Sequence, residues 1–200
     1  MTGAVTDPLR ARKAELRKQV IAARDALPAT ERARFSAAIT ARILSLDAWR
    51  SARCVLAFMT FGSEFDTAAL IADARAAGRT LVLPRVDYAA RRLVLHGVAD
   101  PATDLATGKW GIREPDPARC PVADPAAIDF VVVPGVAFTV GGKRLGYGAG
   151  FYDRLIPTFP ARPPLVAAAF ELQVVDDLPM TERDQRVDLV VTEKDAYLAC

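Results

Sequence analysis

The sequence holds few residues of the kinds that bind metals, form disulfides or act as nucleophiles. There is one histidine, His96, and the three cysteines, Cys54, Cys120 and Cys200, are widely spaced. This set matches no zinc-ligand spacing and supplies neither a Ser–His–Asp nor a Cys–His arrangement. We therefore predict reduced thiols in a cytoplasmic protein, and we interpret His96 as a packed or surface residue of a strand.

Excess charge and long apolar runs are also lacking. The 26 Lys and Arg residues and the 24 Asp and Glu residues give a net charge of +2, which predicts no general attraction to nucleic acid or to a membrane. No apolar run reaches the length of a membrane span, no secretory leader is visible and no internal repeat occurs. With 52% hydrophobic residues, the chain is expected to form one globular, monomeric domain over residues 1–200, with residues 1–7 as a flexible extension.

Short apolar runs alternate with helical patterns along most of the chain. The apolar runs at 54–58, 81–83, 93–97, 130–133, 165–170 and 187–191 predict strands. Helices are expected to begin at Pro8 behind the cap Asp7, at the cap Thr30, at the cap Asp66 or Thr67, and at Phe151. Pro84 would end one strand, and the proline-rich residues 100–125 would form a long irregular surface connection. The alternation predicts an α/β protein, a three-layer α/β/α sandwich with a mainly parallel or mixed central sheet.

The most informative stretch runs from residue 130 to residue 156. An apolar run is stopped by Pro134 and Gly135, and a loop follows that holds Lys143, Arg144 and the glycines Gly141, Gly142, Gly146, Gly148 and Gly150. A strand, a basic glycine-rich loop and a helix together present free backbone N–H groups to a phosphate. The loop is not a P-loop, since no Gly-Lys-Ser/Thr ends it, and it does not match the dinucleotide fingerprint. Glycines also serve ordinary tight turns, so both interpretations stay open on spacing alone.

Cations also crowd the first predicted helix. It carries Arg10, Arg12, Lys13, Arg17, Lys18 and Arg24, and acidic partners at i+4 are scarce. These residues either form a solvated face or serve anionic groups elsewhere in the fold. Trp110 lies in a polar loop, where it either folds back on the core or covers a ligand. Cations, glycines and loop carboxylates together suit phosphoryl transfer with Mg²⁺, which needs positioning and charge stabilisation but no protein nucleophile.

The full string from Pro134-Gly-Val-Ala-Phe138 through Arg144-Leu-Gly-Tyr-Gly-Ala-Gly150 to Phe151-Tyr-Asp-Arg154 resembles the signature of the 5-formyltetrahydrofolate cyclo-ligase family. The resemblance extends over nearly the whole chain, and includes Lys13-Ala-Glu-Leu-Arg17, Glu64-Phe-Asp-Thr67, Pro84-Arg-Val86 and Lys109-Trp-Gly-Ile-Arg-Glu-Pro115. It implies an ATP- and Mg²⁺-dependent ligase of cytoplasmic one-carbon metabolism that acts on a small folate.

The resemblance also implies roles for individual residues. ATP would be bound by Lys13, Ala14, Glu15, Leu16, Arg17 and Arg24 in the first helix, and by Gly142, Lys143, Arg144, Leu145, Gly146, Tyr147, Gly148, Ala149, Gly150, Phe151 and Tyr152 in the loop. The folate would meet Phe58, Met59, Glu64, Trp110 and Tyr152, with Glu64 accepting hydrogen bonds from the amino edge of the pterin. Asp153 and Asp184 would be the Mg²⁺ ligands, and Lys13, Arg144 and Asp153 the catalytic residues.

The sequence departs from the family pattern at four positions. Ala149 stands where Lys or Gly is common, Thr139 where Asp is usual, and Phe151 replaces the first of two tyrosines. Arg183 precedes Asp184 where His or Asn is more familiar, which places a cation beside the proposed metal ligand. None of these changes removes a group that the chemistry requires, although the lack of Lys at 149 gives more weight to Lys13, Lys143 and Arg144.

Two other functions stay open from the sequence. A non-catalytic relative would bind folate or nucleotide on the same fold. A sugar-phosphate isomerase or transferase would also bind phosphate at a glycine loop, but it would need a base or nucleophile, for which Asp66, Asp153 and Glu171 are the candidates.

Overall fold

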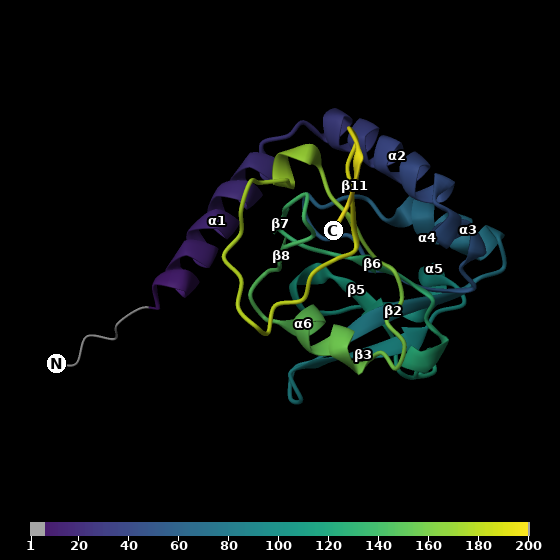
Figure 1. Cartoon of the computed structure of the whole chain (residues 1–200). Helices are drawn as coiled ribbons and strands as arrows, with labels where there is room; N and C mark the ends of the chain where they lie inside the picture. The colour runs from purple at the N-terminus through teal and green to yellow at the C-terminus, as the bar shows by residue number, and fades with distance from the viewer. Residues whose placement is uncertain (1–6, 200) are drawn as a thin grey trace.

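The structure is a computed structural model that describes residues 7–199, apart from the side chain of Trp110. The extension expected over residues 1–7 therefore falls, except for Asp7, outside the described residues. Within that range a seven-stranded sheet forms the centre, in the order β11–β10–β9–β6–β1–β2–β3 (Figure 1). Its strands are β1 (Cys54–Leu56), β2 (Thr80–Asp87), β3 (Arg92–Gly97), β6 (Phe130–Val133), β9 (Leu165–Ala168), β10 (Leu189–Val191) and β11 (Ala196–Leu198).

The inner strands are parallel and the two edge strands are antiparallel. β1 pairs in parallel with β2 and β6, and β6 and β10 both pair in parallel with β9. β3 and β11 run antiparallel to their neighbours. Every residue of β1, β6 and β9 is buried, which is why these strands read as continuous apolar runs rather than as alternating ones.

Helices cover both faces of the sheet, as predicted for a three-layer α/β sandwich. Val55, Val132 and Val166 pack on one face against α2 (Ala29–Ser45), α3 (Asp47–Ser51) and α4 (Ala68–Ala76) (Figure 1). Leu56, Val131 and the other residues of opposite parity pack on the second face against α6 (Phe151–Leu155) and η3 (Ile156–Thr158). The predicted fold class is therefore confirmed.

The first helix stands apart from these two layers. α1 (Pro8–Asp25) begins behind Asp7, whose side chain accepts a hydrogen bond from the Leu9 N–H at 3.1 Å, as predicted. Its Leu16 and Val20 pack on a small hairpin of β7 (Ala137–Phe138) and β8 (Arg144–Leu145). The helix therefore lies against the glycine-rich loop rather than against the main sheet.

Several predicted element boundaries are wrong. α2 begins at Ala29 behind Pro28, so Thr30 lies in its first turn and is not the cap. The boundary of α4, by contrast, is as predicted: the helix follows its cap Thr67, while the Asp66 carboxylate accepts from the Ala68 N–H at 2.9 Å. The strands predicted at 54–58, 165–170 and 187–191 are shorter than expected. β2 instead continues through Pro84 to Asp87, because beyond Val82 it pairs only with β3, and proline is tolerated on such an edge.

Residues 100–125 are more regular than predicted. They contain α5 (Pro101–Asp104), a hairpin of β4 (Leu105–Thr107) and β5 (Arg113–Pro115), and η1 (Lys109–Gly111) between the two strands. η2 (Pro125–Ala127) follows, and η4 (Glu171–Gln173) lies after β9. The short strands escaped prediction because three residues are too few to show an alternating pattern, and β5 also ends in a proline.

His96 is a packed strand residue, consistent with the sequence. It is buried in β3, and its Nδ1 lies 2.8 Å from the carbonyl oxygen of Cys120. Cys54 and Cys120 are buried free thiols, and burial raises the pKa of Cys54 to about 11, so its thiol stays protonated. Over residues 7–199, no helix is both long and apolar enough to cross a membrane.

Candidate active site

A cavity of about 430 Å³ opens where β1, β2 and β6 end. Ligands of open α/β sheets bind at the carboxyl ends of parallel strands, so the position itself favours a binding site. Its lining is Phe58, Met59, Phe61 and Glu64 after β1, Pro84, Val86 and Leu93 from β2 and β3, Ile112, Arg113 and Glu114 around β5, Pro134 after β6, and Arg144, Gly146, Tyr147, Ala149, Gly150, Phe151, Tyr152 and Asp153. The wall is mostly apolar and its charged groups converge from separate segments.

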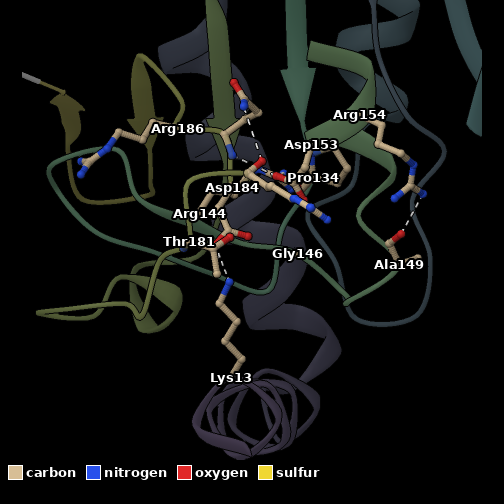
Figure 2. A network of polar contacts seen from close by, with 12 residues as sticks. Lys13, Pro134, Arg144, Gly146, Ala149, Asp153, Arg154, Thr181, Asp184 and Arg186 are labelled. Carbon is tan, nitrogen blue, oxygen red and sulfur yellow. Dashed lines mark hydrogen bonds and ion pairs between the residues drawn. The ribbon is translucent and has the colours of Figure 1, made fainter. Parts of the chain in front are cut away.

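Arg144 and Asp153 form an ion pair at the wall of this cavity. Nη2 of Arg144 donates to Oδ1 of Asp153 at 2.6 Å, and the same oxygen accepts from the Gln185 N–H at 3.0 Å (Figure 2). Arg144 is only 5% exposed, and its Nε has no hydrogen-bond partner among the described residues. A buried guanidinium donor without a partner is costly, so this atom suits a ligand oxygen that the structure does not contain.

A second ion pair joins α1 to the segment before β10. Lys13 extends from α1 and its Nζ bonds Oδ2 of Asp184, which also accepts from the backbone and side chain of Thr181 (Figure 2). Burial opposes ionisation of Asp184, but the bonds from Lys13 and Thr181 outweigh it, so the pKa of this carboxyl is lowered. Lys13 and Asp184 therefore hold opposite charges beside the glycine-rich loop.

Arg17 connects α1 to that loop directly. Its Nε donates to the carbonyl oxygen of Gly146 at 2.7 Å. Gly148 has a φ of +102°, a backbone conformation that favours glycine, whereas a Cβ there would only be in ordinary contact, 3.4 Å from Cζ of Arg17. Burial lowers the pKa of Arg17, while the charges of Asp184 and Asp153 act in the opposite direction.

Glu64 and Tyr147 meet inside the cavity from two different loops. The Tyr147 hydroxyl bonds Oε1 of Glu64, and the Phe61 N–H donates to Oε2 at 3.0 Å. Arg24 lies over the Tyr147 ring, 5.9 Å from its centroid, and its Nε donates to the Ser63 hydroxyl at 2.9 Å. Burial raises the pKa of Glu64, and the bonds from Tyr147 and Phe61 only partly offset this.

Tyr152 lines the same cavity with an unsatisfied hydroxyl. Among the described residues this buried oxygen has no hydrogen-bond partner, and the Tyr152 ring lies 5.9 Å from Cζ of Arg144. Burial raises the pKa of Tyr152, so the hydroxyl is protonated and can donate. Tyr152 and Arg144 thus both line the cavity, and each has one buried polar atom without a hydrogen-bond partner among the described residues.

Other predicted site residues lie outside the cavity. Ala14 and Glu15 are exposed on α1, whereas Leu16 and Leu145 pack together in an apolar cluster. Lys143 pairs with Asp177, and a Cβ on Gly142 would lie 2.3 Å from the carbonyl oxygen of Val187. The Trp110 side chain lies outside the described part of the structure, although Ile112 and Arg113 nearby line the cavity.

The cations of α1 divide between the two interpretations that the sequence left open. Lys13, Arg17 and Arg24 contact other segments, and Arg24 is only 3% exposed, so the solvated-face interpretation is wrong for these three. Arg10, Arg12 and Lys18 are exposed, as a solvated face requires.

The fit to a magnesium ion can be judged from the two predicted ligands. Over residues 7–199 no group of three or more His, Cys, Asp or Glu side chains could hold a metal by itself. The charges of Asp153 and Asp184 nevertheless both act on one guanidinium, that of Arg17, which itself bonds the glycine-rich loop. Mg²⁺ in nucleotide sites usually takes one or two carboxylates and completes its shell with phosphate and water. The pair therefore fits a nucleotide-bound Mg²⁺ and not a site made of protein ligands alone.

Sequence reasoning missed part of the cavity wall. Phe61, Leu93 and Pro134 line it without having been assigned a role. Leu93 belongs to an alternating strand, so its face could have been deduced only with the register of β3 against β2. The contact between Glu64 and Tyr147 joins residues 83 positions apart, and no local pattern indicates it.

Comparisons with known proteins find related sequences and a related fold. The model of the 5-formyltetrahydrofolate cyclo-ligase family matches residues 9–193. The chain is 31% identical to the 5-formyltetrahydrofolate cyclo-ligase of Mycolicibacterium smegmatis over 94% of this chain and 96% of that one, and 26% identical to the mouse enzyme over 94% and 95%. The NMR structure of Aquifex aeolicus 5,10-methenyltetrahydrofolate synthetase superposes with a TM-score of 0.82 at 34% identity, covering 94% of this chain and 92% of that one.

Proposed function

Because the chain belongs to the 5-formyltetrahydrofolate cyclo-ligase family, we propose that it converts 5-formyltetrahydrofolate and ATP into 5,10-methenyltetrahydrofolate, ADP and phosphate. The observation that carries this proposal is that two residues lining the cavity, Arg144 and Tyr152, each have a buried polar atom without a partner in the described part of the chain. Two orphan donors beside an apolar pocket suit a ligand with a flat ring and an anionic or carbonyl oxygen.

The proposed chemistry begins at the formyl group. The formyl oxygen attacks the γ-phosphorus of ATP, the bond to the bridging oxygen breaks, and ADP leaves with the electron pair. This phosphorylation converts a poor leaving group into a good one. N10 then bonds the activated carbon and loses its proton, and the C–O bond breaks to release phosphate. No protein nucleophile is required, which agrees with a site built of cations and carboxylates.

The residues of α1 and of the glycine-rich loop would manage the transferring charge. Arg144 would donate to the phosphoryl oxygens from a fixed position, since it is buried and tied to Asp153. Lys13 and Arg17 would approach the same phosphates from α1, where both already face the loop. Mg²⁺ held by Asp153 and Asp184 would neutralise phosphate charge. Binding of ATP would therefore replace the pair between Lys13 and Asp184 by contacts with phosphate and Mg²⁺.

The folate would occupy the apolar part of the cavity. Phe58 and Met59 would cover the pterin and exclude water, which matters because an activated formyl group hydrolyses readily. Glu64 would accept hydrogen bonds from the amino edge of the ring. The Tyr152 hydroxyl would donate to a ligand oxygen and so gain the partner that it lacks.

The rival functions find less support. Asp66 is exposed and its carboxylate accepts from the Ala68 N–H, the Glu171 carboxylate bonds Tyr197 and Thr192, and neither residue lines the cavity as a base would have to. The third candidate, Asp153, lines the cavity but is paired with Arg144. A non-catalytic relative on the same fold would lack part of the charged set, yet Lys13, Arg144 and Asp153 are all in place.

The test follows the absorption band of the methenyl product with purified protein, 5-formyltetrahydrofolate and Mg²⁺, with and without ATP. An ATP-dependent rise is expected. Asp153→Asn should reduce the rate of this rise about 100-fold, the typical cost of losing one charge-stabilising group. Asp47→Asn, an exposed carboxylate in a surface pair at 3.6 Å, is the matched control and should leave it unchanged. No rise, with both ligands still bound, would point to the non-catalytic relative.

A further inference from the structure

The Tyr147–Glu64 hydrogen bond joins the two predicted substrate sites. Tyr147 belongs to the glycine-rich loop expected to hold the nucleotide, and Glu64 to the loop after β1 expected to hold the pterin. The hydroxyl bonds the carboxylate across the cavity, between segments 83 residues apart. Apart from this bond, the one other hydrogen bond of the Glu64 carboxylate, among the described residues, comes from the Phe61 N–H of its own loop. The Tyr147 hydroxyl is therefore the external anchor of this side chain.

Helix α1 supports both ends of this connection. Arg17 donates to the carbonyl of Gly146, directly before Tyr147. Arg24 covers the Tyr147 ring and donates to Ser63, directly before Glu64, and the Ser63 hydroxyl in turn donates to Asp25. A shift of the glycine-rich loop is consequently transmitted to Glu64 through the hydroxyl, while the helix keeps the two loops facing each other.

We propose that the Tyr147 hydroxyl couples the two sites, so that nucleotide bound at the glycine-rich loop raises the affinity of the cavity for 5-formyltetrahydrofolate by holding Glu64 in its pterin-binding orientation. Tyr147 is in this view a positioning residue, and its role rests on the proposed function. A carboxylate oxygen has two lone pairs, so Oε1 can accept from Tyr147 and from the ligand together. By linkage, the folate must raise the affinity for the nucleotide by the same factor.

The charge of Glu64 gives a second consequence. Burial already raises its pKa, and the Tyr147 bond is among the interactions that oppose the rise. Other titratable or charged residues share the cavity with Glu64 or lie beside it. They are Arg24 from α1, Arg144, Tyr152 and Asp153 from the glycine-rich loop and α6, and Arg113 and Glu114 near β5. Loss of the Tyr147 hydroxyl should raise the pKa of Glu64 further, so that Glu64 becomes neutral at a higher pH. The pH below which folate affinity falls should therefore be higher as well.

The experiment measures the dissociation constant of 5-formyltetrahydrofolate by calorimetry, with and without a non-hydrolysable ATP analogue and Mg²⁺. In the parent the analogue should tighten folate binding about fivefold or more, the lower end for coupled sites. The measured ratio is the dissociation constant without the analogue divided by that with the analogue. In Tyr147→Phe, which keeps the ring beneath Arg24, this ratio should fall to about one. As the pH is lowered, the folate affinity of this variant should also begin to decline at a higher pH than that of the parent. Tyr147→Met, which also lacks the hydroxyl, provides the same test if the Phe variant folds poorly.

The control is Tyr197→Phe. Its hydroxyl also bonds a glutamate, Oε1 of Glu171 at 2.8 Å, but neither residue lines the cavity. Tyr197→Phe should therefore show the same ratio as the parent. A parent-like ratio in Tyr147→Phe, or a ratio of one in a parent that binds both ligands, would overturn the coupling and leave the proposed function standing. A parent that binds neither ligand would overturn both.

Discussion

At the scale of single residues, the site contains groups whose bonding is incomplete and groups whose bonding is already complete. Tyr152 and Arg144 each have a buried polar atom without a partner among the described residues. Lys13 and Asp184 satisfy each other in an ion pair. The first kind costs stability until a ligand arrives, whereas the second contributes stability that a ligand must replace. Substitution should therefore affect stability in opposite directions in the two cases.

Removal of the Tyr152 hydroxyl should separate activity from stability. Tyr152→Phe takes away a buried oxygen that has no partner, so the free energy of unfolding should stay unchanged or rise by about 1 kcal/mol. Turnover should nevertheless fall about tenfold, the value of one neutral hydrogen bond to the substrate. Urea denaturation and the absorbance assay measure the two effects. A clear loss of stability would mean that the hydroxyl has a structural partner.

Lys13→Ala should lower kcat/KM about 100-fold, because one cation of the phosphate site is lost and Asp184 is left unpaired. Lys18→Ala is the matched control, since Lys18 lies exposed on the same helix. Initial rates at varied ATP concentration should show the effect of Lys13→Ala and none of Lys18→Ala. Equal rates for both variants would remove Lys13 from the site and leave its pair with Asp184 as a surface contact.

At the scale of elements, the glycine-rich loop combines two tasks. Its first part, around Gly142, packs against the chain before β10, and its second part, from Arg144 onward, faces the cavity. The family resemblance assigned both parts to ATP. The geometry indicates that Gly142 is required for close packing.

Gly142→Ala should therefore destabilise the fold. The new Cβ would lie 2.3 Å from the Val187 carbonyl oxygen, and the φ of +76° disfavours any side chain, so a loss of about 3 kcal/mol is expected. Gly62→Ala is the comparison, because its φ of +61° is similar but nothing lies within 4 Å, and it should cost about 1 kcal/mol. Thermal unfolding of the two variants measures the two losses of stability. Equal losses would show that the cost comes from backbone conformation alone and not from the close contact with Val187.

Elements were predictable from the sequence where the pattern is local. The buried strands β1, β6 and β9 read as apolar runs, and Asp7 with Pro8 marks the beginning of α1. β11 was missed because a half-buried three-residue edge strand has no such pattern. Within the site, Arg144 and Asp153 follow from a contiguous motif, whereas the contact between Glu64 and Tyr147 depends on how distant loops meet. Tertiary pairing of that kind is decided by the whole fold.

At the scale of the whole molecule, two carboxylates of the site should make the free energy of unfolding depend on pH in opposite directions. The pKa of Asp184 is lowered, so its contribution is present above the ordinary value of about 3.9 and is lost as the pH falls. The pKa of Glu64 is raised, so stability is lost as the pH rises from about 4.3 through the raised value. At neutral pH, Asp184→Asn should consequently be less stable than the parent and Glu64→Gln more stable.

Urea midpoints measured from neutral to acid pH test this pair. Both differences from the parent should shrink toward zero as the two carboxyls become protonated, with that of Glu64→Gln disappearing first, at the higher pH. Differences that stay constant with pH would show that the substitutions act through packing and not through charge.

The pairing of Lys13 with Asp184 and of Arg144 with Asp153 cancels the charges of two cations of the site within the protein itself. A basic groove would gather mobile anions from the buffer and lose affinity steeply as salt displaces its ligand. Here the counter-charges are covalently part of the protein, so dissolved salt has little to displace. Uptake of Mg²⁺ with its nucleotide changes the local balance of charge less than uptake of the bare nucleotide does, because the cation cancels part of the phosphate charge. Affinity for the magnesium complex should therefore fall less steeply with rising salt than affinity for the bare nucleotide.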